Sequence, residues 1–262
     1  MIREAGLVRA IPSARPRQET EAVLSRYQDW FYDFSFTNGA ATRSPGEVVS
    51  RIHTTRAELI FPLLDEMYQG RWPQVSCLDV ACHQGWFAMQ VAARGARKVL
   101  GVDLRPEHVE MASAVCGVGQ LNNVEFRQRN LYEIRPDREG EFDLTFFLGV
   151  LYHLDNPLEA LRILRRVTRR VCVIETQVAR PGPEFECLWG AGAPRKGPAL
   201  ALVASEPNHV EGGLACVLVP TLAALYQMLH AAGFPRLCLS VPTPEMHAQY
   251  VNYDRVVLFA QT

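Results

Sequence analysis

The sequence predicts an α/β fold of the Rossmann-like type, in which a mostly parallel, seven-stranded sheet ends in an antiparallel C-terminal edge strand. Two observations support this fold class. Short apolar runs, which are typical of buried parallel strands, alternate along the chain with segments of helical periodicity. The first two runs also end in aspartates, Asp79 and Asp103. Such polar residues are typical of the ligand-binding edge of an open α/β sheet.

The first βαβ unit lies between residues 75 and 103. We expect a strand, a helix and a second strand over Val75–Val80, Trp86–Arg94 and Lys98–Val102. Gly95 ends the helix as its C-terminal cap. Ligands of open α/β sheets bind outside the carboxyl ends of the strands. Asp103 is therefore placed to accept two hydrogen bonds from a ribose diol, with Leu104 beside it.

The loop after the first strand indicates which nucleotide binds. A dinucleotide site needs three glycines in the pattern G-x-G-x-x-G, which admit a pyrophosphate to the helix N-terminus. Here the loop offers only Gly85, and Asp79 would bring a carboxylate close to any phosphate. An acidic residue suits a cationic ligand without phosphates, such as the sulfonium and ammonium of S-adenosylmethionine. We therefore expect S-adenosylmethionine, with an NAD-dependent oxidoreductase as a distant alternative.

The stretch from Asp79 to Gly85 resembles the first motif of class I S-adenosylmethionine-dependent methyltransferases, D-x-G-x-G-x-G. Ala81 and His83 occupy the first two glycine positions of that motif. The resemblance implies the class I methyltransferase fold; an ordinary buried βαβ unit is the alternative. The cofactor-binding residues that we predict are Asp79, Ala81, His83, Gly85, Trp86, Asp103, Leu104, Asn130, Leu131 and Leu148.

Later segments continue the alternation of strands and helices. Asn130 follows the third strand and either holds the adenine amine or forms an Asx turn. Asp155 or Asn156 caps a helix with Pro157 in its first turn, and Thr221 caps a later helix that Gly233 ends. The expected strands are Val124–Arg127, Phe142–Leu148, Arg170–Gln177, Leu237–Val241 and Arg255–Ala260, and the later helix is Leu222–Ala232.

A second block, GVLYH at residues 149–153 followed by P-L-E-x-L and a strand that ends I-E-T, is more specific. It resembles the tRNA wobble-uridine carboxymethyltransferase family over roughly Cys77–Phe234. That family uses a carboxylated S-adenosylmethionine, and the resemblance implies that Tyr152 and the loosely aligned Arg255 bind its extra carboxylate. The family also uses an upstream lysine, whereas the first lysine of this chain is Lys98. We therefore expect ordinary S-adenosylmethionine.

Methyl transfer needs alignment of donor and acceptor and often a base for the acceptor's proton. Tyr152 and His153 are the predicted catalytic residues, because they follow the fourth strand, near Glu175 at the end of the fifth. His153 has a suitable ordinary pKa for a base near neutral pH. His83 on the first loop is a further candidate. Each histidine could instead fill a structural position.

Two additions decorate the expected domain of residues 71–262. Residues 1–70 form a helical cover, with helices over Glu19–Trp30 and over Glu47–Tyr68, the second bent at Pro62. Residues 179–220 are rich in Gly and Pro and are expected to form an acceptor lid. The aromatic residues of the cover either form plain core or line the acceptor pocket, in which case Trp30, Tyr32 and Arg43 are the expected lining residues.

Composition favours an enzyme that acts on a small molecule. The 262 residues carry a net charge of −1, which gives no global basic field to attract tRNA. The arginines of 162–170 form either a solvated helix face or a nucleic-acid patch. Seven widely spaced cysteines, the lack of a signal-peptide core and the lack of a run of about 20 apolar residues predict a cytoplasmic protein without membrane partners.

We therefore predict methyl transfer to a small-molecule acceptor, with tRNA as the less favoured acceptor. A non-catalytic, cofactor-binding scaffold is an alternative that agrees with the two lost glycines. No cysteine or histidine spacing is typical of a zinc site, so no metal is expected. The sequence leaves the oligomeric state open between a monomer and a homo-oligomer.

Overall fold

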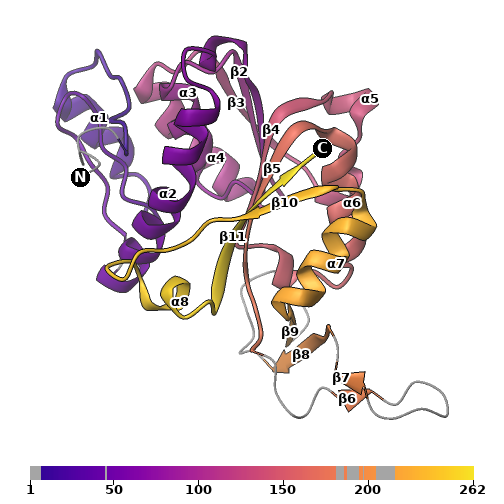
Figure 1. Ribbon diagram of the computed structural model, residues 1–262. Coiled ribbons are helices and arrows are strands. Elements are labelled where there is room, and N and C mark those ends of the chain that lie inside the picture. Colours follow the sequence, from indigo (N-terminus) through magenta and orange to yellow (C-terminus); the bar gives the residue numbers. More distant parts are fainter. Residues whose placement is uncertain (1–6, 45, 181–185, 188–194, 197, 205–215) are drawn as a thin grey trace.

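The computed structural model describes residues 7–44, 46–180, 186–187, 195–196, 198–204 and 216–262. Its centre is a seven-stranded sheet made of β1 (Ser76–Val80), β2 (Lys98–Asp103), β3 (Val124–Gln128), β4 (Phe142–Leu148), β5 (Thr168–Gln177), β10 (Arg236–Leu239) and β11 (Arg255–Gln261). The strand order is β10-β11-β5-β4-β1-β2-β3 (Figure 1). The predicted strands therefore all exist, and none of their ends is shifted by more than two residues.

Most of the sheet is parallel. β1 pairs in parallel with both β2 and β4, and the parallel pairing continues to β3 on one side and β5 on the other. β11 is antiparallel to β5 and to β10, so the antiparallel strand lies next to the edge strand β10. This arrangement confirms the predicted Rossmann-like class. The carboxyl ends of β1, β2, β4 and β5 consequently meet at one end of the sheet.

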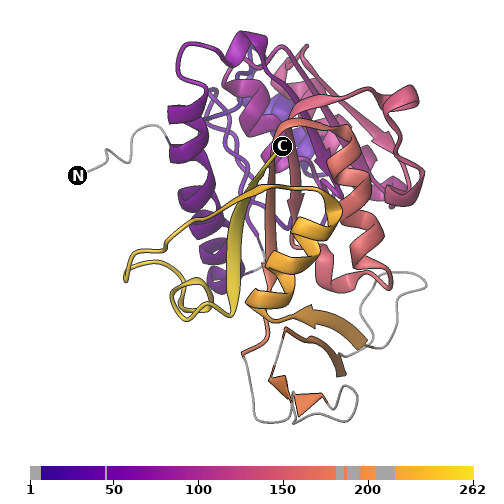
Figure 2. The same ribbon diagram turned by 45° about the vertical axis from the view of Figure 1, so that its right-hand side comes forward.

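Helices cover both faces of the sheet (Figures 1 and 2). One face carries α2 (Glu47–Met67), α3 (Trp86–Ala93) and α4 (Pro106–Gly119), and the other carries α6 (Pro157–Val167) and α7 (Leu222–Ala232). Because successive side chains of a strand point to opposite faces, the adjacent Phe146 and Phe147 of β4 pack into the two different cores. Short helices α5 (Pro136–Glu139) and α8 (Ala248–Val251) lie at the periphery.

The helix caps that the sequence predicts are formed. The side chain of Asn156 accepts a hydrogen bond from the backbone N–H of Glu159 at the start of α6, where Pro157 occupies the first turn. Thr221 caps α7 in the same way, and Gly233 ends that helix with a φ of +100°. These caps satisfy backbone groups that a helix end would leave unpaired.

The N-terminal extension packs on the α2–α4 face. α1 spans only Arg17–Leu24, so the expected helix over residues 19–30 was too long. The following segment is not helical and delivers its aromatic side chains to the core, with Phe34 and Tyr32 both buried. α2 begins at the predicted residue, ends one residue before the predicted end and continues through Pro62; the bend expected there stays a prediction. Among the described helices, none is long and apolar enough to cross a membrane.

Residues 179–220 contain two antiparallel hairpins, β6 (Glu186–Cys187) with β7 (Arg195–Lys196), and β8 (Leu200–Ala204) with β9 (Cys216–Pro220). β9 lies beside the short turn η3 (Leu151–His153), within the GVLYH block. The insertion thus starts from the end of the sheet at which the parallel strands terminate (Figure 1). Much of the predicted acceptor lid falls outside the described residues.

Candidate active site

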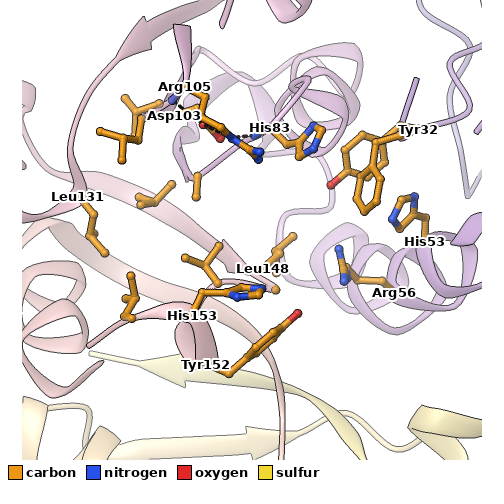
Figure 3. A pocket seen from close by; sticks show the side chains of 18 of the residues that line it. Tyr32, His53, Arg56, His83, Asp103, Arg105, Leu131, Leu148, Tyr152 and His153 are labelled. Carbon is orange, nitrogen blue, oxygen red and sulfur yellow. Dashed lines mark hydrogen bonds and ion pairs between the residues drawn. The ribbon is translucent and has the colours of Figure 1, made fainter. Parts of the chain in front are cut away.

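A cavity of about 440 Å³ opens at the carboxyl ends of the parallel strands (Figure 3). Strands β1, β2 and β4 supply its floor, while α2, η3 and the start of β11 supply its walls. Leu104, Leu131 and Leu148 give it an apolar side, and charged side chains such as Asp103 and Arg56 give it polar ends. This volume lies within the range of small-ligand sites.

The loop between β1 and α3 keeps a glycine-type backbone with only one glycine. Residues 81, 83 and 85, the three glycine positions of the motif, all have positive φ: +56° at Ala81, +52° at His83 and +78° at Gly85. This left-handed conformation is unfavourable for residues that carry a Cβ. The loop is therefore held in its shape by contacts from outside it.

Unlike residues 81 and 83, where Ala and His occupy glycine positions of the motif, residue 85 has to be glycine. A Cβ atom at this position would lie 2.5 Å from the ring of Phe126 on β3, which leaves no room for a side chain. Gly85 is also the N-terminal cap residue of α3, where the chain turns sharply into the helix. The glycine that remains is thus the one that packing requires.

Asp103 anchors this end of the cavity. Its Oδ2 accepts a hydrogen bond from the backbone N–H of His83 at 2.8 Å, and its Oδ1 accepts one from the N–H of Arg105 at 3.0 Å. Burial alone would raise the pKa of Asp103, but these N–H groups and the neighbouring His108 outweigh it, so the pKa lies below its ordinary value. Asp103 is therefore a carboxylate at neutral pH with lone pairs left for a ligand.

Asp79 lies behind the loop. Its Oδ2 accepts a hydrogen bond from the N–H of Ala88 in the first turn of α3, and the residue is buried. Burial, with the charge of Asp103, raises the pKa of Asp79 to about 8. This carboxyl group therefore carries its proton over most of the neutral range unless a cationic ligand binds close by.

Buried and half-buried histidines and aromatic rings form the side of the cavity next to the N-terminal extension. The ring of His83 stacks on His108, with centroids 3.6 Å apart, and on Phe31 at 4.7 Å. His53 of α2 packs against Tyr32 at 4.3 Å. Burial lowers the pKa of His53 to about 2 and, helped by His108 and Arg105, that of His83 to about 3. Both rings are therefore neutral at physiological pH.

Tyr152 and His153 stand on η3 and face the cavity (Figure 3). The hydroxyl of Tyr152 accepts a hydrogen bond from Nη2 of Arg255 at 3.2 Å. Burial lowers the pKa of the half-buried His153, and the positive charges of Arg255 and Arg105 lower it further. His153 is thus a neutral imidazole that can accept a proton from a ligand in the cavity.

A buried charge cluster forms the opposite end of the cavity from Asp103. Glu175, at the end of β5, lies 3.0 Å from Nη2 of Arg56 and 3.0 Å from Nη1 of Arg255, and it accepts a hydrogen bond from the hydroxyl of Tyr250. We call these residues, together with Tyr152, the Glu175 cluster. Burial would raise the pKa of Glu175, but the two arginines outweigh it and hold the pKa below its ordinary value.

Eight of the predicted site residues come together around the cavity: Ala81, His83, Asp103, Leu104, Leu131, Leu148, Tyr152 and His153. Four more, all within the described part of the chain, lie outside its lining. Asp79 and Gly85 support the loop, and the indole of Trp86 donates to the carbonyl of Asp33. Of the two roles expected for Asn130, the structure shows the Asx turn, in which its side chain accepts a hydrogen bond from the N–H of Tyr132.

Comparison with known proteins identifies this architecture. Residues 78–173 match a family model described as a methyltransferase domain. The matched residues are the methyltransferase part of the chain. The match confirms the predicted resemblance to S-adenosylmethionine-dependent methyltransferases, and the residues matched run from the middle of β1 into β5.

Curated relatives of the methyltransferase domain cover part of the chain. The O-antigen chain terminator bifunctional methyltransferase/kinase WbdD of Escherichia coli is 28% identical over 141 residues, which are 53% of this chain and 20% of that protein. A tRNA U34 carboxymethyltransferase of Marinobacter nauticus is 37% identical over 111 residues, which are 41% of this chain and 32% of that protein. The chain thus spans less than half the length of either relative.

Solved structures share the fold over nearly the whole chain. The N-terminal domain of EvdMO1, solved with SAH bound, has a TM-score of 0.68 at 19% identity and covers 95% of this chain and 98% of its own. Magnesium protoporphyrin IX methyltransferase of Synechocystis PCC 6803, also with SAH bound, has a TM-score of 0.57 at 16% identity, covering 84% and 89%. At 95% coverage the shared fold extends well beyond residues 78–173.

Phe31, Ile52, His53 and Arg56 line the cavity although the sequence did not indicate them, and of the three pocket residues expected in the extension only Tyr32 lines it. Trp30 packs against the core and Arg43 is exposed. A signal for two of the missed residues exists in α2. His53 and Arg56 stand at helical spacing in line with the buried Ile60 and Phe61, so polar residues interrupt an apolar stripe.

Proposed function

We propose that this chain transfers a methyl group from S-adenosylmethionine to a nucleophilic atom of a small-molecule acceptor. The observation that carries the proposal is the position of Asp103, an ionised carboxylate at the end of β2 that borders the cavity and is fixed by two backbone N–H groups. A ribose diol needs such an acceptor. The methyltransferase match over residues 78–173 supports the same conclusion.

The residues present fit this cofactor. Asp103 would hold the ribose hydroxyls, and the apolar side chains of Leu104 and Leu131 would contact the adenine ring. Ala81 is small enough to let a ligand approach the loop, and the loop has the left-handed backbone of the glycine motif. A sulfonium or ammonium group would also stabilise the ionised form of Asp79, whose pKa of about 8 lies high without it.

Bound S-adenosylmethionine would supply an electrophilic methyl group to the acceptor atom, and the electron pair of the broken C–S bond would stay on sulfur in the product S-adenosylhomocysteine. The chain's own residues have two further tasks. His153 would take the proton that the acceptor loses, because its imidazole is neutral and faces the cavity. Tyr152, fixed by Arg255, would orient the acceptor.

Two measurements test the proposal. Mass spectrometry of small molecules released from the freshly purified protein should find S-adenosylmethionine or S-adenosylhomocysteine. Calorimetric titration should then show that both bind and that NAD does not. If the protein released neither molecule and bound neither on titration, the proposal would be wrong, and a scaffold without cofactor would take its place.

The second candidate is modification of the tRNA wobble uridine with a carboxylated cofactor. The contact between Tyr152 and Arg255, the two residues implied by the family resemblance, favours it. The net charge of −1 disfavours a large polyanionic substrate. Release of carboxylated S-adenosylmethionine from the purified protein would move this candidate to first place.

Two further expectations stay predictions: that the protein is cytoplasmic and that it forms a homo-oligomer.

A further inference from the structure

The Glu175 cluster holds one more positive than negative charge. Arg56 is 5% exposed and Glu175 is fully buried, while Arg255 reaches them from the other side. Two guanidinium groups therefore share a single carboxylate in a position with little access to water. A buried charge without a partner is strongly unfavourable, so such an arrangement is stable when an anion completes it.

The uncompensated charge faces the cavity. Arg56 and Arg255 both line it, and the guanidinium of Arg56 points toward the same space as the hydroxyl of Tyr152 (Figure 3). Nη2 of Arg56 lies 3.0 Å from Oε2 of Glu175 in an ion pair, and Nε of Arg56 donates to the hydroxyl of Tyr250 at 3.4 Å. Among the described residues, Nη1 of Arg56 makes no hydrogen bond, which leaves a donor for a ligand.

Backbone geometry keeps this space open. Gly149 follows β4 with a φ of +76°, and a Cβ atom there would lie 3.4 Å from Nη2 of Arg56 and 3.5 Å from Oε2 of Glu175. Its N–H donates to the carbonyl of Glu175 at 2.9 Å. These separations are ordinary van der Waals contacts, so the left-handed φ is the reason that glycine is favoured at this position, and a side chain there would occupy space beside the guanidinium.

Two strands of the sheet separate the Glu175 cluster from Asp103, which marks the proposed ribose end of the cavity. Asp103 belongs to β2, whereas Glu175 and Arg255 belong to β5 and β11, and both β1 and β4 lie between them. An anion bound by Arg56 and Arg255 would therefore lie across β4 from the nucleoside. This is the side at which Tyr152 and His153 face the cavity.

We propose that the acceptor carries an oxyanion, a carboxylate or phosphate, and that Arg56, Arg255 and Tyr152 bind it. The inference rests on the proposed methyl transfer and names its substrate class. Guanidinium groups suit the task because their planar N–H donors match the oxygens of carboxylates and phosphates. Arg56 comes from the N-terminal extension, so the extension supplies acceptor specificity in addition to a wall. Glu175 positions both arginines.

The test is titration of the full chain, saturated with S-adenosylhomocysteine, with inorganic phosphate, acetate and neutral acetamide. We expect phosphate or acetate to bind and acetamide not to bind. Arg56→Gln should weaken oxyanion binding at least tenfold, and Arg56→Lys should retain part of it. Arg51→Gln, a change of an exposed arginine on the same helix, should leave it unchanged. Equal oxyanion affinity in the wild type and Arg56→Gln would overturn the inference.

Two further comparisons separate the inference from its alternatives. S-adenosylhomocysteine affinity should agree within about twofold between the wild type and Arg56→Gln. If S-adenosylhomocysteine bound but neither oxyanion did, this inference alone would fail; if S-adenosylhomocysteine did not bind, the proposed function would fail. The last comparison uses carboxylated S-adenosylmethionine. If it bound over tenfold more tightly than S-adenosylmethionine, and Arg56→Gln removed that difference, the anion would belong to the cofactor and the acceptor assignment would be wrong.

Discussion

The backbone N–H of His83 donates to Oδ2 of Asp103 at 2.8 Å, which ties the loop after β1 to the residue that ends β2. Each partner depends on the other. The hydrogen bond helps to hold His83 in a left-handed conformation, and together with His108 and the N–H of Arg105 it favours the ionised form of Asp103 at the edge of the cavity. A substitution of Asp103 should consequently affect both the ligand and the loop.

We expect Asp103→Asn to weaken S-adenosylhomocysteine binding by about 10- to 100-fold, because hydrogen bonds to a charged group contribute about 1.5–3 kcal/mol. Isothermal titration calorimetry measures the change. Asp137→Asn, which alters an exposed aspartate on α5, is the control and should bind as the wild type does. Unchanged binding by Asp103→Asn would remove the basis of the site assignment.

Ala81→Gly should stabilise the protein. A residue with a Cβ costs about 1–2 kcal/mol in the left-handed region, and part of that is offset because glycine has greater freedom in the unfolded chain. The free energy of unfolding should therefore rise by about 0.5–1 kcal/mol, as measured by urea denaturation. Ala114→Gly, at a right-handed position inside α4, should instead lower it by about 1 kcal/mol. A loss of stability in both variants would show that the loop carries no such strain.

Stability should fall in acid because of the buried neutral histidines. The pKa of His53 is about 2 in the folded protein and 6.5 in the unfolded chain, so the unfolded state binds the extra proton below pH 6.5. The stabilisation is present above pH 6.5 and is lost as the pH falls, by about 1.4 kcal/mol per pH unit for one such group. Asp79, with its raised pKa, acts in the opposite direction over part of this range.

His53→Phe isolates the contribution of that histidine, since Asp79 and His83 are present in both proteins. Between pH 6.5 and 5 the variant should lose about 1.5 kcal/mol less of its free energy of unfolding than the wild type loses. Denaturation curves at the two pH values provide the comparison. Parallel losses would mean that His53 is protonated in the folded state.

Glu175→Gln should be strongly destabilising. The substitution leaves Arg56 and Arg255 without their carboxylate in a buried position, and breaking such a pair costs about 3–5 kcal/mol. Glu125→Gln breaks the exposed pair with Arg127 and should cost less than about 1 kcal/mol. Thermal denaturation distinguishes the two. Equal, small effects would show that water screens the Glu175 cluster.

Local sequence patterns were sufficient for most of the sheet. β4 and α7 have the predicted ends because an apolar run and a Thr221–Gly233 pair of caps determine them locally. α1 was predicted too long because the aromatic residues that follow Leu24 resemble a helical face, whereas tertiary packing draws them into the core. Propensity is a weak guide where such long-range contacts decide the conformation.

The two ends of the cavity also differ in how far their residues could be predicted from the sequence. Asp103 could be predicted because the end of a parallel strand has a fixed place in the fold. The periodicity of α2 shows that Arg56 interrupts an apolar stripe, but it does not state which part of the sheet the helix covers, so the place of Arg56 in the site could not be predicted. Only the docking of α2 brings Arg56 within 3.0 Å of Glu175, more than a hundred residues later in the chain.

The three left-handed residues of the β1–α3 loop differ in how freely they can change. The ring of Phe126 fills the space next to Gly85, whereas Ala81 and His83 border the cavity. Since the backbone is held from outside by Asp103, a new side chain at residue 81 or 83 alters the shape of the binding site and leaves the chain path intact. Residues 81 and 83, which are glycines in the motif, are therefore two positions at which the ligand selectivity of this chain can be redesigned.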